Sequence, residues 1–240
     1  MTAEVAARNL QERIADNPYP GRGIVIGRNE AGEWIQVYWI MGRSPNSRNR
    51  LFAYEDEILR TQAADPSKVA DPSLIIYNAL RQLDGNSIVT NGAQTDGIYE
   101  GLQQGKSFAE SLLDWNHEPD APNFTPRISG LIELAKGAVW LSAIKVSPFT
   151  SEQSEHHFFR YADIQPGFGY AVTTYSGDGN PLPSFDGAPY LLALQGDAAQ
   201  IAAGFWGALD EDNKISLAVQ QIDPKSGESK MEIVNKYSAV

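Results

Sequence analysis

The chain has 240 residues, of which 42% are hydrophobic and 20% charged, a formal net charge of -11, and no cysteine. This composition is typical of a globular protein with a sizeable core, and the length allows one large domain or two small ones. The acidic balance argues against nonspecific nucleic-acid binding, which needs broad basic patches. Without cysteine, thiol nucleophiles, disulfides and thiolate metal sites are excluded.

The amino-terminal residues lack the continuous apolar core of a signal peptide, and no apolar run reaches membrane-spanning length. We therefore expect a cytoplasmic protein with no membrane or nucleic-acid partner. A small anionic ligand in a local basic pocket stays compatible with the acidic net charge.

The first elements follow from apolar spacing. Residues 2–16 predict an amphipathic helix that Asn17-Pro18 ends, lying on the domain or on a neighbouring subunit. The main body begins at residue 19, and a turn through 28–32 leads to a strand at 33–41. Both faces of that strand are largely apolar, which predicts a covering layer on each side.

Residues 74–80 allow two interpretations. Asp71-Pro72 could start a helix, whereas the Ile-Ile-Tyr run and the Asp84-Gly85 turn favour a hairpin with residues 87–90. We favour the hairpin. Three later helix starts are predicted: Thr95 or Asp96 as a cap, a capping box at 107–110, and Asp197. Polar loops are expected at 116–123 and 177–184, and further strands at 125–134, 138–146, 155–163, 168–175, 214–222 and 230–237.

These elements form hairpins interrupted by helices in two places, without regular strand–helix alternation, which disfavours a parallel Rossmann-type sheet. We expect an α+β fold of two packed antiparallel sheets with helices outside. A single domain spanning 1–240, with 1–17 as an added helix, is the preferred organisation.

A basic turn at residues 42–50 stands out in this acidic chain, because it holds Arg43, Arg48 and Arg50. Arginine suits forked contact with phosphate or carboxylate, so the turn could cradle a phosphate. A solvated loop is the competing interpretation.

Other candidate chemistry is weak. Gly167-Phe168-Gly169 lacks the last glycine of a dinucleotide fingerprint, and adjacent strand residues His156 and His157 should point to opposite faces, so no metal site is expected. His117 and Glu118 could act as general acid or base, or simply be solvent-exposed. A free Thr2 nucleophile is disfavoured because nothing local activates it.

Six stretches, taken together and in order, resemble the archaeal-type IMP cyclohydrolase family. The amino-terminal helix departs from that pattern, because archaeal members begin close to the first strand. The matching stretches are Tyr19-Pro20-Gly21-Arg22, 42–50, Tyr77-Asn78, 91–96, 123–128 and 173–185.

The resemblance implies a four-layer αββα sandwich, the fold of N-terminal nucleophile hydrolases, without autoprocessing. No Ser, Thr or Cys is available for release near Tyr19, which agrees with that absence. The implied reaction closes 5-formamidoimidazole-4-carboxamide ribonucleotide (FAICAR) to IMP with loss of water, the final step of de novo purine synthesis. It implies a purine nucleotide as small-molecule partner, a homo-oligomer, no cofactor and no metal.

The same resemblance suggests residue roles. Arg43 and Arg50 would grip the 5′-phosphate or polarise the formyl oxygen, with Arg22 or Arg48 as lesser candidates; Arg48 could instead face water. Tyr77 would donate at the formyl group and Glu118 act as base. The remaining substrate-binding candidates are Asn46, Asn91, Thr95, Asp96 and Arg127.

Two of these roles have structural alternatives, since Tyr77 could be a strand-packing aromatic and Asp96 a plain helix cap. Two alternative functions also stay open. One is a purine-nucleotide-binding protein without turnover, and the other is an enzyme acting on a related nucleotide or amide.

Overall fold

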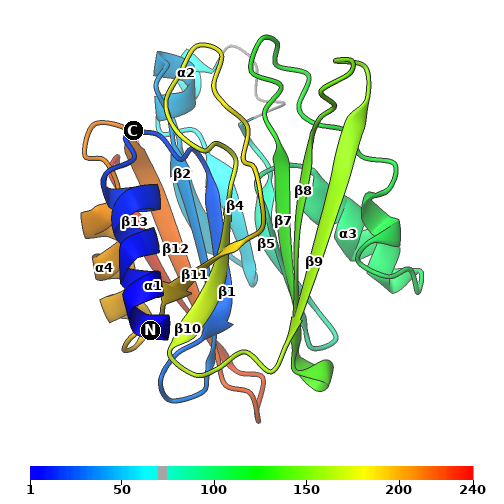
Figure 1. Ribbon diagram of the computed structural model, residues 1–240, viewed down its shortest axis with the longest axis vertical. Coiled ribbons are helices and arrows are strands. Elements are labelled where there is room, and N and C mark those ends of the chain that lie inside the picture. Colours follow the sequence, from blue (N-terminus) through cyan, green and yellow to red (C-terminus); the bar gives the residue numbers. More distant parts are fainter. Residues whose placement is uncertain (70–74, 240) are drawn as a thin grey trace.

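Two antiparallel sheets form the body of the computed structural model, which describes residues 1–69 and 75–239 (Figure 1). The expected α+β class with two antiparallel sheets is confirmed. The six-stranded sheet has the order β11-β10-β1-β2-β12-β13. Its strands are β1 (Gly23–Arg28), β2 (Trp34–Met41), β10 (Phe168–Thr173), β11 (Tyr190–Ala193), β12 (Lys214–Ile222) and β13 (Ser229–Asn235).

The second sheet contains seven strands in sequential order from β3 to β9, so each connection joins neighbours. Its strands are β3 (Leu51–Glu55), β4 (Ile58–Gln62), β5 (Asn78–Leu83), β6 (Asn86–Thr90), β7 (Arg127–Glu133), β8 (Ala138–Val146) and β9 (Ser154–Ala162).

Helices lie outside the sheets (Figure 1). Helix α1 (Thr2–Leu10), extended by a wider turn over Gln11–Ala15, contacts β11, and α4 (Ala198–Ala208) contacts β12 and β13. Helix α3 (Gln94–Gln103) packs on β5 and β6 of the other sheet. None of the described helices has the length and apolar character needed to cross a membrane.

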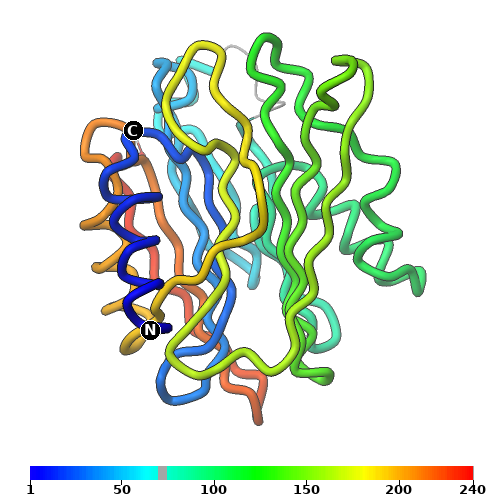
Figure 2. The backbone as a smooth tube through the Cα atoms, in the orientation of Figure 1, coloured from blue at the N-terminus to red at the C-terminus, as the bar shows by residue number. Residues whose placement is uncertain are grey.

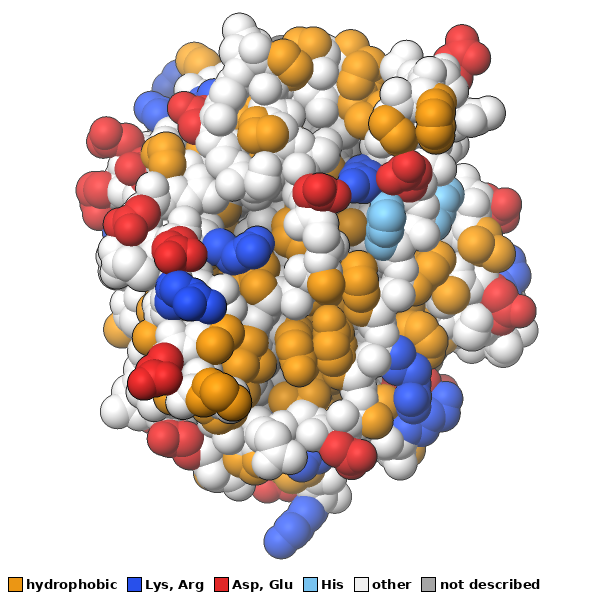
Figure 3. Space-filling view, viewed as in Figure 1, with side chains coloured by type: hydrophobic (Ala, Val, Ile, Leu, Met, Phe, Trp, Pro, Cys, Tyr) orange, Lys and Arg blue, Asp and Glu red, His pale blue; other side chains and the backbone are white. Residues whose placement is uncertain are grey.

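The space between the sheets holds the main apolar core. All eight residues of β2 are buried, which confirms the prediction of a strand covered on both sides. The sheets pack tightly at Gly130, where an added Cβ would lie 2.5 Å from the Cδ1 atom of Ile26. At one side of the molecule Tyr161 of β9 and Tyr170 of β10 stack with centroids 3.8 Å apart, and apolar side chains gather along the middle of that face (Figure 3).

The hairpin interpretation of residues 74–80 is confirmed from Asn78 onward. β5 pairs with β6 as far as Leu83 and Asn86, and Asp84 and Gly85 form the turn with φ values of 48° and 75°. Positive φ at both positions matches the twist that a tight hairpin requires. Residues 71–72, where the competing helix would begin, lie outside the described residues.

Two helix predictions were wrong in detail. Helix α3 begins after Ala93, without a side-chain cap, so neither Thr95 nor Asp96 caps it. The capping box between Ser107 and Glu110 does form, but only a 3-10 turn over Glu110–Leu112 follows. Leu113 is 58% exposed, so a longer helix would have no further apolar face to bury there.

The helix start at Asp197 is confirmed, because its side chain accepts from the Gln200 amide. Strands β4 and β11 were not predicted. Both are short and carry no turn signal as clear as Asp84-Gly85. Other short elements are α2 (Pro45–Arg48) and 3-10 turns at Pro66–Lys68 and Leu134–Lys136.

Four chain segments meet at one end of the two sheets, because neighbouring strands run antiparallel. β1 and β7 begin there, whereas β2 and β10 end there. Figure 2 shows the yellow loop that follows β10 passing close to the light-blue α2 segment at the top of the view. The loops at this end therefore come together from distant parts of the sequence.

Candidate functional site

A cavity of about 250 Å³ lies among these loops. Its walls come from the segment before β1, the β2–β3 connection, the loop before β7 and the segment after β10. Three of the predicted arginines line it. The lining residues are Tyr19, Gly21, Arg22, Met41, Arg43, Ser44, Ser47, Arg50, Asp120, Asn123, Thr125, Thr174, Tyr175 and Leu182.

Arg50 is the most buried of these arginines, with 1% of its surface exposed. Its Nε donates to the Ser47 carbonyl at 2.8 Å and its Nη2 to the Met41 carbonyl at 3.1 Å. Nη1 has no hydrogen-bond partner among the described residues. Burial lowers the pKa of Arg50, and the nearby charge of Arg22 lowers it further. A buried cation with an unused donor favours an anionic ligand.

The turn that carries Arg50 is shaped by its own side chains. The Ser44 hydroxyl accepts from the Ser47 amide at 3.1 Å, and the Ser47 hydroxyl accepts from the Ser44 amide at 3.0 Å, which starts the short helix α2. Arg48 is half-buried and donates to the Gly42 carbonyl and to Asn213, so it is not a freely solvated side chain. Arg48 braces the turn from behind.

Arg43 lies at the rim of the cavity. Its guanidinium stands 4.9 Å from the centroid of the Tyr19 ring and forms an ion pair with Asp178. The same Nη1 also donates to the Gly179 carbonyl at 3.1 Å. Arg43 thus ties the loop after β10 to the β2–β3 connection, although both partners of the pair are partly exposed.

Arg22 and Glu118 form a charged contact that is more deeply buried than the Arg43–Asp178 pair. Arg22 Nη1 donates to both carboxylate oxygens, at 3.0 and 3.1 Å, and Arg127 Nη1 lies 4.0 Å from the same carboxylate. Burial opposes the charge on Arg22, but Glu118 holds the pKa of the guanidinium well above its ordinary value. Burial raises the pKa of Glu118, against the opposing effect of Arg22 and Arg127.

The solvent-exposed interpretation of residues 117 and 118 was therefore wrong. Glu118 is 2% exposed and His117 8% exposed. The His117 Nδ1 atom lies 2.9 Å from the Ser154 hydroxyl. Burial lowers the pKa of His117, with Asp120 opposing and Arg127 reinforcing the effect.

Tyr77 meets a partner that the sequence did not suggest. Its hydroxyl lies 2.6 Å from the hydroxyl of Tyr38, across the gap between the sheets. Burial raises the pKa of Tyr38 well above its usual range, and Tyr77 adds to that rise. The charges of Arg22 and Arg50 act on the pKa of Tyr38 in the opposite direction.

The other predicted binding residues do not line this cavity. The Asn91 side chain accepts from the Ile128 amide and donates to the Pro126 carbonyl. The hydroxyls of Thr95 and Thr90 lie 2.7 Å apart. Three more lie elsewhere: Asp96 accepts from Asn78 and Arg81, Asn46 is exposed on α2, and Arg127 donates to the Asn116 carbonyl at 2.8 Å.

Sequence reasoning gave no role to Asp120, Thr125 and Tyr175, which line the cavity and contact one another. Thr125 and Tyr175 belong to the matched stretches, and Asp120 lies five residues before Thr125 in a polar loop. Nothing in the sequence connects Tyr175 to the other two, because fifty residues separate it from Thr125.

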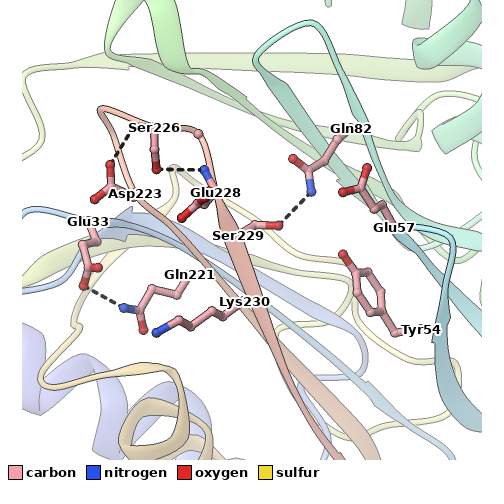
Figure 4. Close-up of a pocket in the computed structure, with 11 residues that line it drawn as sticks. Glu33, Tyr54, Glu57, Gln82, Gln221, Asp223, Ser226, Glu228, Ser229 and Lys230 are labelled. Carbon is pink, nitrogen blue, oxygen red and sulfur yellow. Dashed lines mark hydrogen bonds between the residues drawn. The ribbon is translucent and has the colours of Figure 1, made fainter.

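A larger cavity of about 760 Å³ lies at the opposite end of β2 (Figure 4). Its charged residues are the carboxylates of Glu33, Glu57, Asp223 and Glu228 with a single lysine, Lys230. Such a surface repels phosphate, so the smaller arginine-lined cavity is the better candidate for an anionic ligand.

Metal-ligating side chains are dispersed. Within residues 1–69 and 75–239, no three His, Asp or Glu side chains gather closely enough to hold a metal ion. His156 Nε2 lies 2.8 Å from the Trp115 carbonyl, whereas His157 contacts Glu155.

Comparison with known proteins covers most of the chain. Residues 19–227 match the family described as IMP cyclohydrolase-like protein. IMP cyclohydrolase of Methanopyrus kandleri is 32% identical over 170 residues, which cover 69% of this chain and 79% of that protein. IMP cyclohydrolase of Methanosphaera stadtmanae is 31% identical over 162 residues, covering 65% and 73%. Helix α1 precedes the matched residues.

Proposed function

The chain belongs to the family of IMP cyclohydrolase-like proteins, and we propose that it closes FAICAR to IMP with release of water. The observation that carries this proposal is the convergence of Arg22, Arg43 and Arg50 on one cavity of a chain with net charge -11. Guanidinium groups bind phosphate through paired hydrogen bonds, so such a cavity suits a nucleotide.

The reaction needs geometry and proton transfer rather than redox chemistry. The carboxamide nitrogen attacks the formyl carbon, one N–C bond forms, and the formyl oxygen becomes a hydroxyl. In the second step the C–O bond breaks and the oxygen leaves as water with one proton from the carboxamide nitrogen and one from the formamido nitrogen, and a C=N bond forms to the former formamido nitrogen. Holding the two groups in contact supplies much of the rate, and positioned acids and bases supply more.

Phosphate binding is assigned to Arg43 and Arg50. The Nη1 of Arg50, which has no partner within residues 1–69 and 75–239, supports this role, since a phosphate oxygen would satisfy it. Arg43 is paired with Asp178 in the free protein, so phosphate would replace that carboxylate as its partner. Arg22, held by Glu118, would add positive charge to the same cavity.

Proton transfer is assigned to Glu118 and Tyr77. The raised pKa of Glu118 supports a role as base toward the carboxamide nitrogen, because a base works best when its pKa lies nearer the working pH. Tyr77 would donate toward the formyl oxygen, with Tyr38 holding its hydroxyl in place. Neither Glu118 nor Tyr77 lines the cavity directly, but Glu118 is bonded to Arg22, which does.

Supporting roles suit most of the other predicted residues. Asn91 and Thr95 would hold the loop between β6 and α3, and Arg127 would stabilise Glu118, without touching the nucleotide. Asp96 would hold Arg81, and Asn46 would contact a ligand only beyond the rim.

Four further expectations, on the layer architecture, the domain organisation, the oligomeric state and the location, are also proposals. Helices α1 and α4 on one sheet and α3 on the other support a four-layer αββα sandwich of the N-terminal nucleophile hydrolase type. One apolar core shared by both sheets supports a single domain. The family resemblance is the ground for a homo-oligomer, and the composition supports a cytoplasmic location.

The test is a spectrophotometric assay of FAICAR closure by the purified protein, together with thermal shifts produced by IMP. We expect turnover in the wild type and its loss in Arg50→Gln. Arg81→Gln is the matched control, since Arg81 pairs with Asp96 outside the cavity. Stabilisation by IMP without turnover would instead indicate the nucleotide-binding protein, and no response to either nucleotide would refute both functions.

A further inference from the structure

Three side chains lining the cavity form a connected chain: Asp120, Thr125 and Tyr175. Asp120 Oδ1 accepts from the Thr125 amide at 2.7 Å, and Asp120 Oδ2 contacts the Thr125 hydroxyl. That hydroxyl also contacts the hydroxyl of Tyr175. Thr125 and Tyr175 are 3% and 5% exposed, so water competes little for these bonds.

The direction of the protons along this chain is determined by its first member. A carboxylate can only accept, so the single proton of the Thr125 hydroxyl must point to Asp120. The Thr125 oxygen can then only accept from Tyr175, so the single hydroxyl proton of Tyr175 is engaged in the bond to Thr125. The phenol oxygen of Tyr175 consequently offers a ligand only an acceptor.

Thr125 is the single described residue that shares a hydrogen bond with the Tyr175 hydroxyl, and the direction derived for that bond leaves the Tyr175 oxygen without a donor. The ring is held firmly, because it stacks on Tyr19 with centroids 5.9 Å apart and its backbone amide donates to the Pro20 carbonyl at 3.1 Å. Burial raises the pKa of Tyr175 to about 12, so the phenol keeps its proton at neutral pH. A ligand with an O–H donor at this point would complete the network.

We propose that the oxygen of Tyr175 accepts a hydrogen bond from a ribose hydroxyl of the bound nucleotide, with Asp120 and Thr125 as positioning residues. This inference rests on the proposed function. Tyr19 stacks with Tyr175 and also contacts the Arg43 guanidinium, so the acceptor and a phosphate-binding guanidinium both adjoin one aromatic ring. The ribose is the nucleotide group next to the phosphate, and it carries neutral O–H donors whereas the phosphate offers acceptors.

The experiment compares the binding of IMP, 2′-deoxy-IMP and 3′-deoxy-IMP by calorimetry. Tyr175→Phe removes the acceptor and keeps the ring. We expect this variant to weaken IMP binding about tenfold, which corresponds to the loss of one hydrogen bond. The deoxy analogue that lacks the contacted hydroxyl should bind to the variant and to the wild type equally well. Tyr161→Phe is the matched control, since burial raises the pKa of that phenol to about 12 as well but Tyr161 does not line the cavity.

Asp120→Asn tests the direction of the chain without removing an atom from it. The new amide nitrogen can donate to Thr125, which then donates to Tyr175, and Tyr175 turns its proton toward the cavity. A ribose hydroxyl can accept as well as donate, so we expect this variant to keep the contact with its direction reversed and to bind IMP more tightly than Tyr175→Phe. The double variant Asp120→Asn/Tyr175→Phe should bind IMP no more weakly than Tyr175→Phe alone.

Two results would overturn the inference by itself: unchanged IMP binding in Tyr175→Phe, or an equal loss for all three nucleotides. Either result is informative only if the wild type closes FAICAR and binds IMP, and these two properties of the wild type are measured in the same series of experiments. A wild type that does neither overturns the proposed function, and this inference falls with it. Thermal melting of each variant verifies that it is folded.

Discussion

Replacement of Glu118 by glutamine should destabilise the protein strongly. Glu118 is 2% exposed and accepts two bonds from Arg22, while Arg127 lies 4.0 Å away. Glutamine keeps the shape but removes the negative charge, which leaves the buried Arg22 without compensation. Breaking a buried ion pair by removing one partner costs about 3–5 kcal/mol. Because an amide oxygen can still accept one of the bonds, we expect about 3 kcal/mol for Glu118→Gln.

For a chain of this size, 1 kcal/mol shifts the melting temperature by roughly 2–4 °C, so the expected decrease is about 6–12 °C. Denaturant unfolding and calorimetry measure it. Asp178→Asn is the matched control, because Asp178 also pairs with an arginine of the cavity but is 50% exposed. An exposed pair contributes about 0–1 kcal/mol. Equal losses in the two variants, or a loss below about 1 kcal/mol in Glu118→Gln, would refute the reasoning.

Three further predictions concern the site. Tyr77→Phe should lower the kcat for FAICAR closure about 100-fold and leave IMP affinity nearly unchanged, as a general acid would require; steady-state kinetics and calorimetry distinguish the two. Asp178→Asn should tighten IMP binding several-fold, because the carboxylate no longer competes for Arg43; weaker binding would contradict that competition. Burial lowers the pKa of His117 below 6.5, so the unfolded chain binds its proton more readily and stability should fall as the pH drops through 6.5. His117→Gln should flatten this dependence in pH-dependent denaturation, and an unchanged slope would exclude His117 as its source.

Local patterns determined many of the elements. The tight turn at Asp84-Gly85, the capping box at Asp197 and the two-faced apolar run of β2 each act between neighbours in the chain, so each could be read from the sequence. The predictions of secondary structure were wrong where tertiary packing, and not the local sequence pattern, determines the element. The capping box at Ser107 formed as expected, yet only a 3-10 turn follows it, and Leu113 just beyond that turn is 58% exposed.

The sequence by itself determined the chemical inventory of the site: a cluster of arginines in an acidic chain, a polar loop with Glu118, and motifs that match one family. Only the tertiary structure decided which of these residues meet. Arg22 and Glu118 are 96 residues apart, and Thr125 and Tyr175 fifty apart, yet each pair is in contact. Burial, too, exists only after folding, and it is burial that leaves Arg50 with an unused donor and alters the pKa of Glu118. The physical reason is that ion pairing, desolvation and the direction of a hydrogen-bond chain depend on distances in space, which sequence spacing does not specify.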